Sequence, residues 1–413
     1  MTTGLADNVR KLRRTAGMTQ EDLAHASRLS LTTVAKVEQG GHVSMGSLAA
    51  LAAALNVTTA ALFASEAPRS VVGQEDEENR RSLAELRRAL MPPLGLSVPQ
   101  MEAGDAEEPR TIQRSVKDGH ALYQADRYGA VARQLPALLR SSEAAVAILE
   151  GEEKEHAKIA RAHALLLTGK FLTQVRQYDM AYLALSEAIR LAQETGQTQL
   201  AATGVNGLCW LLLRQDRFAE SERLAVQTAA EIEPRLSTAS PDQIALWGEL
   251  WLRVAAASRR NGRKDVAKHA RRMAKSAGSA MQREHSDFPS HWGGFGPATV
   301  AAKAAEDLAL IGDARGVLRK AEEGPLSPKG MKAVGRLNMN NWGRHRLDVA
   351  HAHTLLGSHQ DAMDELVNLR ETADTWLTHQ PMARRVMTDI LKTRKRTLTE
   401  EMRSMAVHLG VSG

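Results

Sequence analysis

The fold of the N-terminal region is decided by two adjacent segments, MTQEDLA at residues 18–24 and LSLTTVAKVEQG at residues 29–40. Thr19 precedes three polar residues, two of them acidic, so it can cap a helix whose dipole favours carboxylates in its first turn. Ser30 can cap a second helix in the same way. The two segments therefore predict two short helices joined by a tight bend, which is the helix-turn-helix arrangement.

The second predicted helix has an apolar side and a polar side. Val34 and Val37 point inward, and the outward-pointing side chains are Leu31, Thr32, Thr33 and Lys36. In a helix-turn-helix this second helix enters the major groove and presents residues near its start to base edges. The hydrogen-bonding and basic side chains on this face indicate DNA reading. The alternative is a small helical fold that has lost DNA binding and only dimerises or docks on a partner.

Further motifs extend the pattern along the chain: RKLR at residues 10–13, the Thr19-Gln20 start, a VxxVExG ending at residues 34–40, and LxxLAxALNV at residues 48–57. With these motifs, the chain from about Leu5 to Phe63 closely resembles the Xre/Cro/CI family of phage-repressor-type domains. The resemblance implies a five-helix, lambda-repressor-like helix-turn-helix domain.

The same resemblance implies roles for individual residues. Gln20 would contact the DNA backbone beside the reading helix, while Leu31, Thr32 and Lys36 would face base edges. Residues expected near DNA phosphates or at the DNA-facing start of the reading helix are Arg10, Ser30, Thr33, Gly41 and His42. Leu31 stands where many relatives carry a polar base reader, so it would contact a thymine methyl or merely pack, and the operator sequence cannot be deduced.

Composition limits the remainder of the protein. A chain of 413 residues is long enough for two or more cores, and its formal charge of +6 is compatible with nucleic-acid binding. No run of about 18 apolar residues and no signal-peptide core is present, which favours a cytoplasmic protein. Cys209 is the only cysteine, which excludes an intrachain disulfide and a multi-cysteine zinc site. We expect a buried structural role for Cys209, and neither a metal nor a cofactor.

The composition changes between the head and the rest of the chain. Prolines and the acidic run at residues 75–78 interrupt regular structure, and leucines spaced three and four apart predict one short helix at residues 80–90. We therefore expect a helix-turn-helix domain over residues 1–66, a linker over residues 67–110, and a helical sensor and dimerisation domain over residues 111–413.

The long C-terminal region is rich in Ala, Leu, Arg and Glu and is expected to be entirely helical. A degenerate turn phrase recurs about every 40 to 50 residues, at 126–131, 176–181, 216–221, 262–267, 312–317 and 357–362. The phrases resemble the turn between the two helices of tetratricopeptide repeats, most clearly at residues 162–196, where Gly169 would let the helices approach. Their spacing exceeds the 34 residues of the standard repeat. The predicted fold is thus all-α, with a tetratricopeptide-like α-solenoid after the head.

Stacked helix pairs of this kind create a concave surface from their first helices. Placing the turn phrases in register puts eight side chains on or beside that surface: His163, Lys170, Asn206, Trp210, Glu249, Arg253, Arg344 and His351. Asn and Arg side chains there can hydrogen-bond a peptide backbone, and Trp210 can cover an apolar group. The alternative for each residue is a solvated surface position, so only the set is a usable hypothesis.

Other motifs indicate structure rather than chemistry. The glycine-rich stretch at residues 291–297 lacks the features of a phosphate-binding loop and is expected to be a tight loop on the inner wall, either structural or ligand-contacting. The basic stretch at residues 259–275 is spread around a helix, which favours a solvated face. No catalytic triad or paired-carboxylate pattern stands out, so we do not expect an enzyme.

Head and body together resemble the repeat-containing quorum-sensing regulators of the RRNPP group and many actinobacterial regulators. The resemblance implies a homodimer, an inverted-repeat DNA operator, and a small peptide or metabolite as effector. The alternatives are a protein-interaction scaffold and a phage or plasmid repressor controlled by a protein partner.

Overall fold

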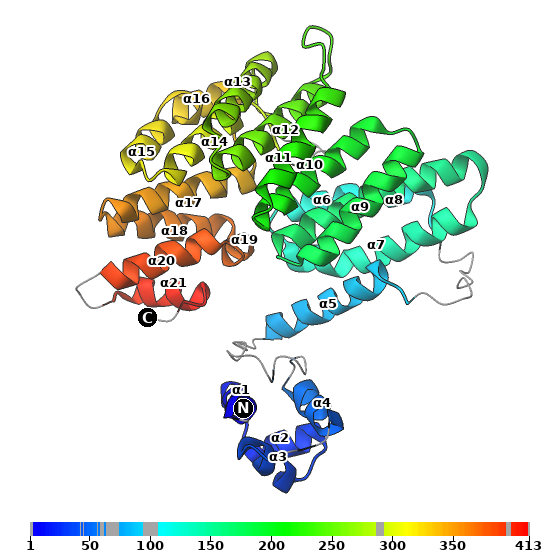
Figure 1. Ribbon diagram of the computed structural model, residues 1–413, viewed down its shortest axis with the longest axis vertical. Helices are drawn as coiled ribbons and strands as arrows, with labels where there is room; N and C mark the ends of the chain where they lie inside the picture. Colours follow the sequence, from blue (N-terminus) through cyan, green and yellow to red (C-terminus); the bar gives the residue numbers. More distant parts are fainter. Residues whose placement is uncertain are drawn as a thin grey trace. The chain divides into compact units, whose positions relative to one another are not determined.

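The structure, a computed structural model, describes residues 3–41, 43, 45–55, 57, 62, 74–93, 106–285, 293–393 and 398–411 (Figure 1). The regular elements within these ranges are all helices, and the single β-type feature among them is an isolated bridge between His285 and Phe295. The predicted all-α class is therefore confirmed. Contacts divide the chain into two compact units, Met1–Leu83 and Ala84–Gly413.

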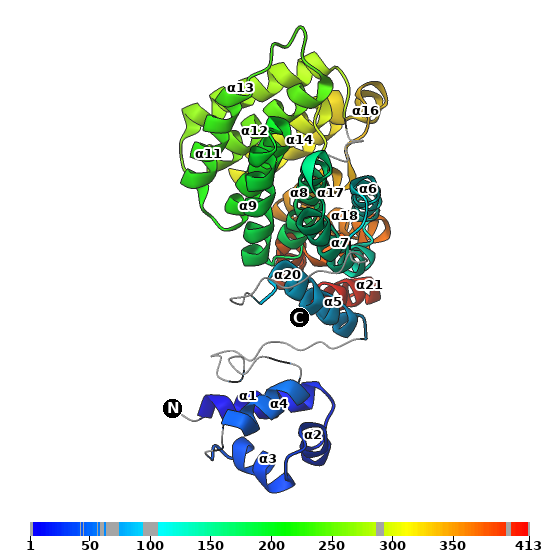
Figure 2. The ribbon, with the colours of Figure 1, turned by 90° about the vertical axis from the view of Figure 1, so that its right-hand side faces the viewer.

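Within the described residues of the first unit, four helices surround one apolar core (Figure 2). They are α1 Thr3–Thr15, α2 Gln20–Ser27, α3 Leu31–Glu38 and α4 Met45–Ala54. The fully buried side chains of the core include Val9, Leu23, Val34, Val37, Leu51 and Leu62. The fifth helix predicted for this domain falls between α4 and residue 66, where only Leu55, Val57 and Leu62 belong to the described residues.

Helix α5, Gln74–Leu90, begins six residues before the helix predicted at residues 80–90. It takes in the acidic run at residues 75–78, which the sequence analysis assigned to a connecting segment. Leu86 and Ala89 are buried on one side of α5.

The second unit is a series of helices with short connections (Figure 1). The helices are α6 Pro109–Gln124, α7 Tyr128–Ile148, α8 Gly151–Gln174, α9 Tyr178–Glu194, α10 Thr198–Arg214, α11 Phe218–Glu231, α12 Pro241–Arg260, α13 Lys264–Met281, α14 Pro297–Leu310, α15 Ala314–Glu322, α16 Pro328–Val334, α17 Met339–Leu355, α18 His359–Thr372, α19 Asp374–Thr378, α20 Pro381–Thr393 and α21 Glu400–His408. A 3-10 turn, η3 Gly324–Leu326, stands before α16.

Each of the six predicted turn phrases lies between two antiparallel-packed helices, and each contains one residue in the left-handed conformation. These residues are Asp126 (φ 59°), Arg176 (φ 65°), Asp216 (φ 58°), Gly262 (φ 74°), Gly312 (φ 75°) and Gly357 (φ 78°). The helical hairpins are α6/α7, α8/α9, α10/α11, α12/α13, α14/α15 and α17/α18, and neighbouring hairpins pack on one another. The turn positions are thus confirmed, while the tetratricopeptide likeness stays a prediction.

Small residues allow close packing within this unit. A Cβ atom on Gly169 would come within 2.6 Å of Leu185 Cγ in the next helix, which is the close approach predicted from the sequence. The glycine-rich loop also packs closely against a glycine of a neighbouring helix. Phe295 is fully buried, and a Cβ on Gly248 of α12 would lie 2.1 Å from its Cζ atom.

A search of the described helices for a long apolar segment found none that would span a lipid bilayer.

We expect the Gly248→Ala substitution to destabilise the protein although alanine favours helices by about 1 kcal/mol. The new methyl group collides with Phe295, and such overpacking costs about 1–3 kcal/mol. Urea unfolding measures the loss, and the same substitution in a Phe295→Leu background is the control. A stabilising effect in the native background would mean that the loop is not seated on α12.

Candidate DNA-reading surface and candidate ligand cavity

Helix α2 begins with the predicted cap. The Thr19 hydroxyl accepts a hydrogen bond from the Asp22 backbone N–H at 3.1 Å, and the Asp22 carboxylate accepts one from the Thr19 N–H at 2.8 Å. The bonds from Thr19 lower the pKa of Asp22. This reciprocal arrangement fixes the start of the first helix of the pair.

Helix α3 also begins as predicted, with Ser30 accepting from the Thr33 N–H at 3.1 Å and the two hydroxyl groups 2.8 Å apart. Ser30 and Thr33 therefore use their side chains to cap the helix. Leu31, Thr32 and Lys36 are exposed, with 44% of Leu31 accessible to solvent. The face predicted to read bases is available for contact.

A buried carboxylate joins the first three helices. Glu38, at the end of α3, is only 2% exposed. It accepts hydrogen bonds from Arg13 Nε at 2.6 Å and Arg13 NH2 at 3.0 Å, and from Gln20 Nε2 at 2.7 Å. Arg10 donates to the backbone carbonyl of Glu38. Burial favours the neutral acid, but the bonds from Arg13 and Gln20 outweigh it and lower the pKa of Glu38.

This cluster changes the interpretation of two predicted DNA-binding residues. Gln20 uses its amide nitrogen within the domain, and Arg10, 40% exposed, lies 3.6 Å from Asp7 as well as near Glu38. The sequence analysis did not identify Glu38 as a link, although an acidic residue next to buried Val37 was visible in the VxxVExG ending. His42, also predicted to lie near DNA, falls outside the described residues.

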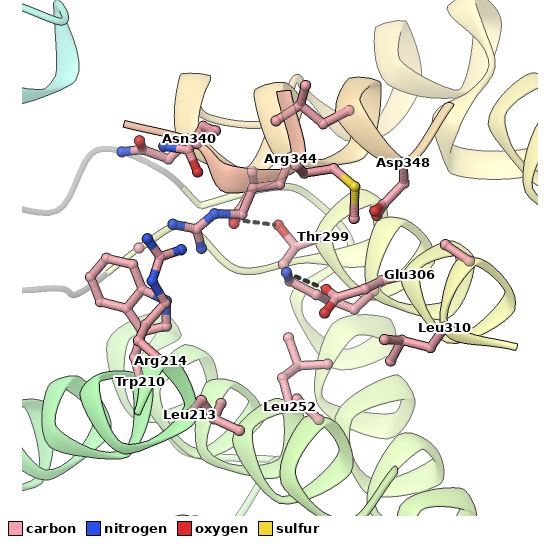
Figure 3. A pocket seen from close by; sticks show the side chains of 18 of the residues that line it. Trp210, Leu213, Arg214, Leu252, Thr299, Glu306, Leu310, Asn340, Arg344 and Asp348 are labelled. Carbon is pink, nitrogen blue, oxygen red and sulfur yellow. Dashed lines mark hydrogen bonds and ion pairs between the residues drawn. The ribbon is translucent and has the colours of Figure 1, made fainter. Parts of the chain in front are cut away.

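The second unit contains a cavity of about 820 Å³. Its walls come from α6, α8, α10, α12, α14, α17 and α20, so the first helix of each of the six hairpins contributes (Figure 3). Gly293 and Gly294 of the glycine-rich loop also line it.

Six of the eight residues predicted for the groove line this one cavity: Lys170, Trp210, Glu249, Arg253, Arg344 and His351. Asn206 is fully buried behind the wall, where its Nδ2 donates to Glu249 Oε2 at 2.5 Å and its Oδ1 accepts from Arg253 Nε at 2.9 Å. Burial lowers the pKa of His163, whose charge acts on the buried His120.

One side of the cavity is aromatic and cationic. The guanidinium carbons of Arg344 and Arg214 lie 4.9 and 5.8 Å from the centre of the Trp210 ring, and Lys170 Nζ lies 4.7 Å from the centre of the Tyr123 ring. Burial lowers the pKa of Lys170 to about 8, with Glu249 opposing the shift. Burial and then the charge of Arg214 lower the pKa of Arg344 to about 10.

The other side carries two carboxyl groups. Glu306 accepts hydrogen bonds from Arg260 NH2 and Lys303 Nζ, both at 2.7 Å, and these charges outweigh burial and lower its pKa. Asp348 lies near Glu306 without such support. Burial and then the charge of Glu306 raise the pKa of Asp348 to about 7.

Seven charged residues that line this cavity were not predicted for the groove from the sequence: Arg214, Asp216, Arg260, Lys303, Glu306, Asp348 and Arg385. A signal was present, because Arg214 follows Trp210 by four residues and Asp348 follows Arg344 by four, which places each pair on one helix face. The helix α14, however, could not be placed opposite α10 and α12 from the turn phrases alone.

Comparison with known families gives a match to the helix-turn-helix family over residues 9–62. No curated protein and no solved structure matches the chain. The match covers α2, α3 and the Glu38 cluster, so this part of the chain is a helix-turn-helix domain and the protein is a DNA-binding transcription regulator.

We expect Glu38→Gln to lower the free energy of unfolding of the head by about 3–5 kcal/mol, because Arg13 loses its buried ionic partner. The native pKa of Glu38 is below its unfolded value, so this stabilisation is present above about pH 4.3 and is lost as pH falls through the native pKa. Hydrogen exchange of α1–α3 against pH measures it. Exposed Glu21→Gln is the control, and equal effects of the two changes would contradict the role of Glu38.

The contribution of Asp348 to stability changes with pH in the opposite direction to that of Glu38. The pKa of Asp348 is raised to about 7, so its contribution to stability declines as pH rises from about 4, its unfolded pKa, to about 7. We expect Asp348→Asn to flatten this decline and to increase the free energy of unfolding at neutral pH by about 1–3 kcal/mol. Urea unfolding across this range is the measurement, with exposed Asp118→Asn as the control. Parallel curves for the native protein and Asp348→Asn would refute the assignment.

Proposed function

We propose that this transcription regulator senses a small molecule or peptide in the cavity of its helical body and that binding alters its affinity for a specific operator. The observation that carries the proposal is a cavity of about 820 Å³ lined by charged side chains, in the same chain as a helix-turn-helix domain. Cavities of about 300–1,000 Å³ with a few convergent polar groups are typical of ligand sites.

The charges in the cavity support this proposal. Lys170 is 3% exposed, and its Nζ atom has no hydrogen-bond partner within the described part of the chain. His351 Nε2 is also buried without a hydrogen-bond partner there. Leaving a buried polar or charged group unpaired is costly. A fold that needed no ligand would gain stability from apolar side chains at such positions.

The position of the cavity suggests how occupancy acts. Its walls belong to helices from six consecutive hairpins, so a ligand that contacts α10, α12 and α17 together favours one spacing of these helices over another. A ligand shifts an equilibrium only by its difference in affinity for the two states. Couplings of about 1–3 kcal/mol, equivalent to about 5- to 150-fold in operator affinity, are usual for regulators.

We further propose that the regulator is a homodimer. A helix-turn-helix dimer reads two half-sites about one helical turn apart, and its two-fold symmetry requires an inverted repeat. On this proposal the exposed Leu31, Thr32 and Lys36 of each copy read one half-site.

Selection of bound sequences from a random duplex pool tests the DNA-reading part of the proposal. We expect the native protein to enrich an inverted repeat and the Thr32→Ala, Lys36→Ala double variant to lose about 1–3 kcal/mol of specific binding energy for each good base contact removed. Lys117→Ala, which removes one exposed positive charge from α6, is the matched control. Enrichment of the same repeat by the double variant would remove these residues from the reading surface.

Sensing is tested next on the enriched operator. Operator affinity is measured with and without the small-molecule fraction of a cell extract, and the ratio of the two values is compared between the native protein and Trp210→Leu. We expect a ratio different from one in the native protein and closer to one in the variant. A ratio of one in the native protein, with extracts from several growth conditions, would count against a sensor.

A further inference from the structure

The cations that line the cavity fall into two groups. The first group has polar partners: Arg260 and Lys303 share the carboxylate of Glu306, and Arg253 is hydrogen-bonded to Asn206. Arg385 also belongs to it, because its Nε lies 3.8 Å from Asp389 Oδ2. Lys170, Arg214 and Arg344 form the second group, which we call the cation cluster. Among the residues that the structure describes, no carboxylate lies within 4.0 Å of the charged nitrogens of the cation cluster.

Aromatic rings and one amide are the neighbours of the cation cluster. Lys170 faces Tyr123, and both arginines lie over Trp210. Gln174, one turn after Lys170 on α8, accepts from Arg344 NH2 at 3.5 Å, so the lysine and this arginine approach the same place from different helices. Arg214 NH2 is buried without a hydrogen-bond partner.

The positive charges of the two arginines repel each other. The charge of Arg214 lowers the pKa of Arg344, in addition to the effect of burial. Figure 3 shows the side chains of Arg214 and Arg344 extending toward the same space beside Trp210. Two arginines placed together without an ion-paired carboxylate among the described residues are arranged for an anion from outside, because bidentate guanidinium groups match carboxylate and phosphate oxygens.

Part of the cavity wall is apolar. Leu213 and Leu252 line it between the arginines and the acidic side, and Leu310 lines it beside Glu306 (Figure 3). Leu310 is 45% exposed and Leu355, which also lines the cavity, is 52% exposed. Half-exposed leucines at a cavity wall offer surface that an apolar group of a ligand would cover.

We propose that the effector is an amphipathic anion, whose carboxylate, sulfonate or phosphate group is held by Arg214, Arg344 and Lys170 and whose apolar body lies over Trp210 and along Leu213, Leu252 and Leu310. This inference rests on the proposed function in that the cavity is taken as the effector site. The anion requirement itself is tested without DNA.

The test uses two fluorescent probes that differ in one group. 8-Anilinonaphthalene-1-sulfonate carries an anion on an aromatic body, and N-phenyl-1-naphthylamine has the same body without the sulfonate. We expect the full-length native protein to bind the sulfonate at least about tenfold more tightly, which corresponds to about 1.4 kcal/mol. Equal affinities would overturn the proposal, and this comparison does not depend on any variant.

Variants locate the binding. We expect Arg344→Met and Arg214→Met each to weaken binding of the sulfonate probe about tenfold or more while binding of the neutral probe changes little. Arg140→Met, which removes an exposed arginine from α7, is the matched control. Sulfonate binding that is as tight in the Arg214→Met, Arg344→Met double variant as in the native protein would overturn the proposal.

The ligand-free variants separate a binding role from a structural one. If the arginines serve to bind an anion, replacing either by Met leaves the melting temperature of the ligand-free protein unchanged or raises it, because an unpaired charge is removed. A fall in the melting temperature of both single variants would show that the arginines support the fold instead, and would overturn the proposal.

Competition distinguishes two sources of the anionic group, a free acid and the carboxyl terminus of a peptide. Decanoate is compared with decanamide, and acetylated trileucine is compared with its carboxamide, as displacers of the bound sulfonate probe. Displacement by either acid at lower concentration than its neutral partner supports the proposal and identifies the source. Equal displacement by acid and amide in both pairs would overturn it.

Operator affinity is measured last, with the effective acid present. Binding of the acid together with an unchanged operator affinity would contradict the proposed sensing function and leave the anion site established. A changed operator affinity without selectivity for the acid over its amide would support the proposed sensing function and contradict the anion site.

Discussion

The helical body depends on one backbone constraint, a single left-handed residue between the two helices of each hairpin. That residue reverses the chain within a few positions, so the second helix must pack against the first. Asp126 and Asp216 tolerate this conformation because of their short polar side chains, and Gly262 adopts it without a Cβ penalty. Repetition of the turn brings all the first helices to one wall, and the cavity exists because of it.

The parts of the structure that were predictable from sequence are those encoded locally. Thr19 and Ser30 predicted where both helices of the helix-turn-helix pair begin, because capping needs only neighbouring residues. The six turn phrases marked the hairpins for the same reason. The partners of buried polar side chains could not be predicted from the sequence. Glu38 meets Arg13 across 25 positions, and Asn206 meets Glu249 across 43, so neither contact leaves a periodic signal.

Two kinds of buried charge coexist in this protein. Glu38 is satisfied by Arg13 and Gln20 and stabilises the arrangement of α1, α2 and α3. Lys170 and Arg344 are held beside aromatic rings and have no carboxylate partner among the described residues. The first kind makes the DNA-reading helix rigid. The second kind lowers the stability of the body, and this cost is the physical basis of the anion site proposed above.

Helix α3 has one side that packs within the domain, at the Glu38 cluster, and another side that is exposed. Its inward side, with Val34, Val37 and Glu38, fixes the helix, whereas Leu31, Thr32 and Lys36 take no part in that packing. Operator choice is thereby free to diverge among copies of this domain while the scaffold is retained. On the function proposed above, a regulator of this design is retargeted to new promoters, in evolution or engineering, by exchange of the exposed face alone.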